Sequence, residues 1–86
     1  MMTSHRILSY INVEPFCPFR IKMTGGEQFE IRHPEMVQVG RTTATIFTWM
    51  SDEHETPMER EREISIILIE SIERLKPVAA HEQPQN

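Results

Sequence analysis

Pro18–Gly40, PFRIKMTGGEQFEIRHPEMVQVG, is the stretch that decides the fold, because it predicts a β-hairpin with a defined register. In its first half every second residue from Phe19 to Met23 is apolar, and in its second half Phe29 and Ile31 continue the pattern. Period-two alternation is typical of a strand with one buried and one solvated face. The two glycines between the halves predict a tight turn.

The length of this turn follows from which residues would face one another. A two-residue loop at Gly25-Gly26 would set Ile21 opposite Glu30, and opposed residues share a face, so a carboxylate would be buried. A loop that also takes in the preceding threonine sets Ile21 opposite Phe29 and Arg20 opposite Glu30. Three-residue loops usually end in a left-handed residue, which suits the second glycine. We therefore predict the three-residue loop.

Several short elements are expected around the hairpin. Ser4 can cap a helix that ends near Asn12, before Pro15. The acidic stretch 51–61 is expected to be a polar loop. Residues 59–75 are ambiguous between strand and helix, since the apolar residues of 64–75 also recur at helical spacing. The density of isoleucine favours strands. Further strands are therefore expected at Met36–Val39, Thr43–Trp49, Ile64–Ile69 and Ile72–Leu75.

A short helix followed by five or six short antiparallel strands is the pattern of a small SH3-like or Sm-like β-barrel. We expect residues 1–75 to form this single domain and residues 76–86 to be a disordered tail. Alternation predicts that Ile67 and Ile69 face outward, where either the N-terminal helix or a second subunit would cover them. The predicted core comprises Phe19, Ile21, Phe29, Ile31, Ile46, Ile64, Ile66 and Leu68.

Composition and charge exclude several classes of protein. The net charge is −4, and residues 51–63 alone contribute six acids against two arginines. An acidic balance disfavours nonspecific nucleic-acid binding, which requires phosphate neutralisation. No apolar run is long enough to cross a membrane, and the N-terminus lacks the apolar core of a signal peptide. The single cysteine excludes an intramolecular disulfide framework. We therefore expect a cytoplasmic protein without membrane contact.

The motifs within residues 5–75 resemble a group of small bacterial proteins. The shared pattern is Pro-Phe-x-Pro-Phe, an alternating strand, a turn that ends in glycine, a second strand, and His-Pro-Glu followed by an apolar residue. The matching positions are Pro15-Phe16, Pro18-Phe19, Gly26, His33–Met36 and Ile64–Leu75. This resemblance implies a fold and carries no activity. The chain differs from the group in its longer acidic segment at 51–63. The likeness to Sm-like barrels is weaker, because their RNA-contacting motif is absent.

Few residues form a pattern that could carry chemistry. The candidate binding residues are cations on the solvated face of the hairpin, a histidine and a strand-end tryptophan: Arg20, Lys22, Arg32, His33, Arg41 and Trp49. Because Glu30 lies among the cations, an ordinary mixed-charge surface is the alternative. His33 and Glu35 could form an acid–base pair, or the histidine could simply hold the bend at Pro34 through a backbone hydrogen bond.

The sequence contains no phosphate-binding loop, nucleophile motif or set of zinc ligands, so we expect no enzyme, cofactor or metal. The function expected from these observations is a protein-interaction module that associates with itself or with another protein. A strand edge would mediate that association. The alternative is an Sm-like or SH3-like nucleic-acid-binding module that uses the candidate residues above.

Overall fold

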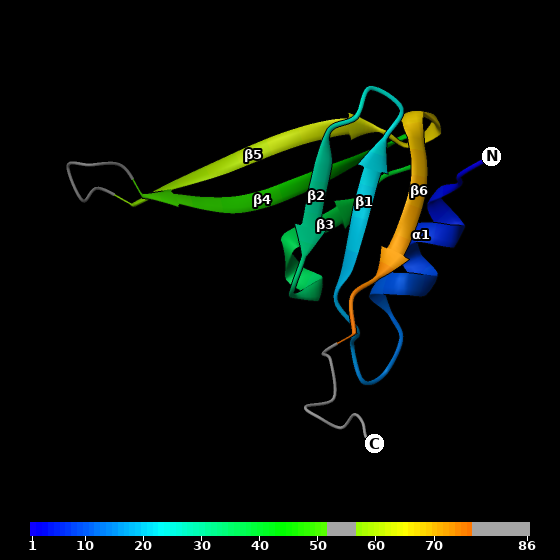
Figure 1. Cartoon of the computed structure of the whole chain (residues 1–86), viewed down its shortest axis with the longest axis horizontal. Coiled ribbons are helices and arrows are strands. Elements are labelled where there is room, and N and C mark those ends of the chain that lie inside the picture. The colour runs from blue at the N-terminus through cyan, green and yellow to red at the C-terminus, as the bar shows by residue number, and fades with distance from the viewer. Residues whose placement is uncertain (52–56, 77–86) are drawn as a thin grey trace, which may run out of the picture.

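The computed structural model describes residues 1–51 and 57–76 (Figure 1). In these ranges the strands form two antiparallel three-stranded sheets, in the orders β2-β1-β6 and β3-β4-β5. No ladder between described residues joins the two sheets into a closed barrel, so the chain is mainly β and barrel closure is not found. The elements are α1 (Ser4–Ile11), β1 (Phe19–Met23), β2 (Gln28–Ile31), the 3₁₀ turn η1 (Pro34–Met36), β3 (Val37–Val39), β4 (Thr43–Ser51), β5 (Pro57–Ser65), the 3₁₀ turn η2 (Ile66–Leu68) and β6 (Ile69–Arg74).

The β1–β2 hairpin has the predicted register. Ile21 lies opposite Phe29 and Arg20 lies opposite Glu30. The Gly26 N–H donates to the carbonyl of the last β1 residue, at 2.9 Å. Gly26 has a φ of 97°, the left-handed conformation that the three-residue loop requires. The prediction from parity is therefore confirmed.

The core lies between the two sheets and is closed on one side by helix α1. The N-cap is Thr3 rather than Ser4, since the Thr3 hydroxyl accepts from the Arg6 N–H at 3.2 Å. Ile7 is the one helix residue that is fully buried. Of the predicted core, Phe29 is only partly buried and Leu68 is exposed. The buried residues are Ile7, Phe19, Ile21, Met23, Ile31, Val37, Ala44, Ile46, Ile64, Ile66 and Ile69.

The predicted strand at Ile64–Ile69 is wrong, because the chain turns there. Strand β5 ends at Ser65. The turn η2 then places Ile67 on the surface, where 64% of this residue is exposed. Ile69 is 5% exposed, although simple alternation placed it outward. It pairs with Met23 after a register shift in the β1–β6 ladder. This shift lets Ile69 and Ile72, three residues apart, both pack on the core.

The predicted polar loop at 51–61 is also wrong over its second half. Residues from Pro57 onward belong to β5, which pairs with β4 along its whole length, from Thr43↔Ser65 to Ser51↔Pro57. Beyond Ile46 the hairpin of β4 and β5 runs away from the rest of the molecule (Figure 1). We call this projecting part, residues 47–51 and 57–61, the arm.

The expected tail at 76–86 lies outside the described residues beyond Lys76. Among the helices in the described part of the chain, none has the length and apolar character that spanning a membrane requires.

Candidate functional site

The charges on β5 alternate strictly, and the β4 register assigns them to two faces. Arg60 lies opposite Thr48 and Arg62 lies opposite Ile46. Opposed residues share a face of the sheet. Both arginines therefore lie on the same face as Ile46, whose side chain is buried in the core. The intervening glutamates of β5, Glu59, Glu61 and Glu63, lie on the other side. Strand β5 therefore has one basic and one acidic face.

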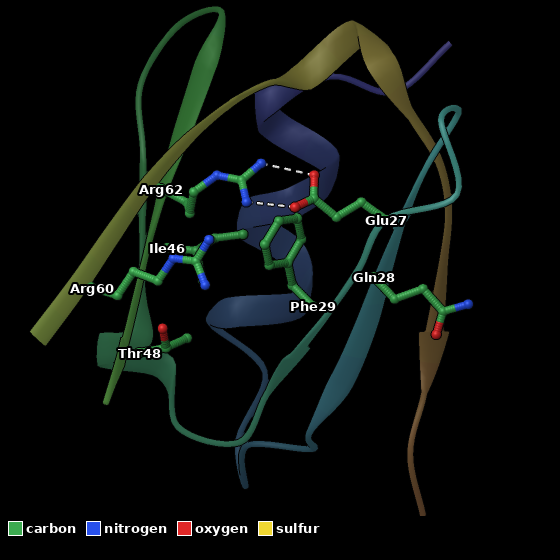
Figure 2. Close-up of a pocket in the computed structure, with 7 residues that line it drawn as sticks. All are labelled: Glu27, Gln28, Phe29, Ile46, Thr48, Arg60 and Arg62. Carbon is green, nitrogen blue, oxygen red and sulfur yellow. Dashed lines mark hydrogen bonds and ion pairs between the residues drawn. The ribbon is translucent and has the colours of Figure 1, made fainter. Parts of the chain in front are cut away.

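Arg62 joins the base of the arm to the first sheet. Its two terminal nitrogens lie 2.5 and 2.8 Å from the two carboxylate oxygens of Glu27, which directly precedes β2 (Figure 2). The guanidinium carbon also lies 5.4 Å from the centre of the Phe29 ring, within cation–π range. A bidentate pair constrains orientation as well as distance. The Glu27–Arg62–Phe29 cluster therefore fixes the direction in which the arm leaves the body.

This pairing changes the proton affinity of both partners. The hydrogen bonds from Arg62 lower the pKa of Glu27, and its charge acts in the same direction. The same hydrogen bonds raise the pKa of Arg62. Both groups are at least one-third exposed, so solvent weakens the interaction and its main effect is geometric.

A hollow of about 260 Å³ lies beside this cluster, between β2 and the start of the arm (Figure 2). It is smaller than the roughly 300–1,000 Å³ of a typical small-molecule site. Among the described residues, no ion pair joins Arg60 to a carboxylate. The arrangement offers a cation and apolar surface but no nucleophile with an adjacent base. The lining residues are Glu27, Gln28, Phe29, Ile46, Thr48, Arg60 and Arg62.

Three of the predicted cations lie together on the solvated face of the first sheet, but each is matched by a carboxylate. Arg20 donates to Glu30 at 3.0 Å and to Glu73 at 3.1 Å. Arg32 donates to Glu30 at 3.1 Å, and Lys22 lies 4.0 Å from Glu70. The hydrogen bonds with Arg20 and Arg32 lower the pKa of Glu30. The surface is therefore a charge-balanced network, the alternative that the sequence left open.

The other three predicted binding residues are dispersed. His33 is exposed at the start of η1, where its backbone carbonyl accepts from the Met36 N–H at 3.0 Å. The backbone therefore makes the bend, and no side-chain bond from His33 caps the turn. Arg41 is exposed in the bend between β3 and β4. The backbone of Trp49 lies in the arm opposite Glu59, and its side chain is outside the described part of the structure.

No group of three His, Cys, Asp or Glu residues within 1–51 and 57–76 is placed to hold a metal ion. His33 and Glu35, the predicted acid–base pair, are both exposed, and their pairing stays a prediction.

Sequence reasoning missed the residues at the base of the arm. Arg60 falls within the predicted polar loop 51–61 and Arg62 lies just beyond it, and neither is among the predicted binding residues. The available signal was the strict alternation over 59–63, Glu-Arg-Glu-Arg-Glu, which is the strand period. Phe29 is predicted in the core, and the structure packs it, partly buried, against the core at the edge of the hollow, within cation–π range of Arg62.

No protein-family model matches this chain, and neither does any curated protein or solved structure.

Proposed function

We propose that this chain is a non-enzymatic protein-interaction module that associates with a second copy of itself through the arm. One observation carries the proposal: the arm is two-stranded. Strand β3 pairs with β4 only as far as Ile46, while β4 and β5 continue to Ser51↔Pro57. Five residue pairs of the hairpin thus extend beyond the three-stranded sheet.

An isolated two-stranded hairpin is marginally stable in water, and a third strand or a packed face is normally needed. The Glu27–Arg62–Phe29 cluster holds only the base of the arm. The sequence of the arm is also rich in large apolar residues, namely Phe47, Trp49, Met50 and Met58. A partner that adds a strand would supply the missing support.

The charge distribution favours a protein partner over a nucleic acid. Arg20, Lys22 and Arg32 are each paired with carboxylates, so phosphates would compete with existing ion pairs. The net charge of −4 adds long-range repulsion. Nucleic-acid binding that weakens with salt and is lost in Arg20→Ala would establish the alternative function.

The proposal is tested by measuring molar mass across a range of concentrations, using size-exclusion chromatography with light scattering. The full chain is compared with a variant in which residues 49–59 are replaced by Asn-Gly, a two-residue turn that fits the Thr48↔Arg60 pair. We expect a mass approaching twice 10.1 kDa for the full chain and a monomer for the shortened variant. A full chain that stays monomeric, or a shortened variant that still dimerises, would refute the proposal. Cooperative unfolding of the shortened variant serves as the folding control.

A further inference from the structure

The backbone of β4 shows which peptide groups face its open edge. The Gly40 N–H donates to the Thr43 carbonyl at 2.8 Å, so the polar groups of Thr43 face β3. In an antiparallel strand the peptide groups of successive residues point to alternate sides. The N–H and C=O groups of Phe47, Trp49 and Ser51 therefore point to the same side as those of Thr43.

Strand β3 does not reach these groups because η1 interrupts it. Continuing the β3–β4 register would place Met36 opposite Phe47. The Met36 N–H is instead bonded to the His33 carbonyl inside η1. Within residues 1–51 and 57–76, no strand pairs with β4 beyond Ile46 on this side. No described strand therefore occupies this edge from Phe47 outward, and the turn η1 contacts β4 at its inner end.

The opposite edge of the arm, on β5, is also unpaired within the described residues, but it carries charge. The Ile66 N–H donates to the Thr42 carbonyl, so even-numbered β5 residues bond to β4. Odd-numbered residues, including Glu59 and Glu61, direct their backbone groups outward. In a two-fold antiparallel pairing of this edge, odd residues oppose odd residues and even oppose even. With the two-fold axis anywhere from Arg60 to Arg62, glutamate would face glutamate and arginine would face arginine, which is unfavourable.

The edge of β4 has no such barrier, because Thr43–Ser51 contains no charged residue. We propose, granted the self-association proposed above, that the interface is the edge of β4 from Phe47 to Ser51. It pairs antiparallel with the same edge of a second copy, with the two-fold axis at Trp49. Phe47 of each copy lies opposite Ser51 of the other. A four-stranded sheet β5-β4-β4-β5 results, and each arm gains its missing third strand.

This register uses every unpaired edge residue of β4 within the described range, from Phe47 to Ser51. A shift of the axis toward Ile46 would bring the second copy against residues of β4 that β3 already pairs. A shift outward would pair fewer of the described residues of β4. For a second copy of this chain as the occupant, one register is thus favoured, and that register can be tested.

The first test compares proline substitutions at two positions that lie opposite one another in the arm. Trp49 and Glu59 lie opposite one another, and each directs its N–H away from the arm's own ladder. Trp49→Pro removes both hydrogen bonds of the central pair, since each copy donates one. Typical net hydrogen-bond energies predict roughly a tenfold to hundredfold weaker dimer by sedimentation velocity. Glu59→Pro should leave the dissociation constant within about twofold.

A weaker dimer for Glu59→Pro alone would overturn the assignment to β4 and point to β5. No effect from either proline would overturn edge pairing altogether. After either of these two outcomes, a wild-type protein that still dimerises would leave the proposed self-association intact. A wild-type protein that stays monomeric would refute the proposed self-association.

A second test does not rely on a proline. In a Cys17→Ser background, Trp49→Cys places two thiols opposite one another across the two-fold axis. Directly opposed Cα atoms in a hydrogen-bonded pair lie about 5.5 Å apart, within the range of a disulfide. We expect rapid dimer cross-linking under mild oxidation, and much slower cross-linking for the matched Glu59→Cys variant. Faster cross-linking of Glu59→Cys would contradict the proposed interface.

Discussion

Replacing Ile69 by alanine tests how the chain turns between β5 and β6. Ile69 is 5% exposed, and a fully buried isoleucine truncated to alanine typically costs about 2–5 kcal/mol. Because a little of Ile69 already meets solvent, we expect a loss of about 2–4 kcal/mol. A domain of this length has a total stability of roughly 4–13 kcal/mol. The substitution should therefore remove a large share of the free energy of unfolding.

Ile67→Ala is the matched control, two residues away and of the same residue type. Ile67 is 64% exposed, so its truncation should change the free energy of unfolding by less than about 0.5 kcal/mol. Urea denaturation followed by circular dichroism measures both variants at one protein concentration, since dimerisation would add stability by mass action. Equal losses for the two variants, or a larger loss for Ile67→Ala, would refute the turn at η2 and restore a continuous strand.

Three further results are expected. Ile7→Ala should lower the free energy of unfolding by about 2–4 kcal/mol, because this side chain anchors helix α1 in the core; a loss below about 1 kcal/mol would mean that the helix is not docked. Gly26→Ala should cost about 1 kcal/mol because of its positive φ, while Gly25→Ala has open space and should change little; equal thermal shifts would count against the turn geometry. Because Arg62 lowers the pKa of Glu27, the contribution of their pair is present at neutral pH and is lost as pH falls through that lowered pKa. The stability difference between wild type and Glu27→Gln should therefore shrink as the pH falls below the ordinary range of a glutamate, and a difference that grows on acidification would contradict the pairing.

The β1–β2 hairpin could be predicted in full because its information is local. Alternation defines the faces, and the alternative register would bury Glu30 against Ile21, so only one loop length fits. The turn at η2 could not be predicted in this way. Ile69 and Ile72 share the core only through a register shift against β1, and such a shift has no signature in an apolar run. The position of Ile69 is thus set by its non-local partner.

The candidate site was harder to predict than the fold, since its residues are distant in the sequence. Arg20, Lys22 and Arg32 could be placed on one face, but Glu70 and Glu73 reach them only through β6. Their neutralisation therefore depends on sheet order. The open edge of β4 also depends on a residue that is distant in the sequence. It exists because the Met36 N–H bonds to the His33 carbonyl within η1 instead of joining the β3–β4 ladder. Local turn chemistry in η1 delays the start of β3 until Val37, whereas β4 continues past the residue opposite it.

Amide hydrogen exchange, measured residue by residue at low and high protein concentration, tests the interface on β4 most directly. The N–H of Thr45 lies within the β3–β4 ladder and should be protected at both concentrations. The N–H groups of Phe47 and Trp49 should exchange quickly at low concentration and become protected as the dimer forms. Those of Glu59 and Glu61 should stay unprotected throughout. Fast exchange of Phe47 and Trp49 at every concentration, or new protection on the glutamates instead, would contradict the account.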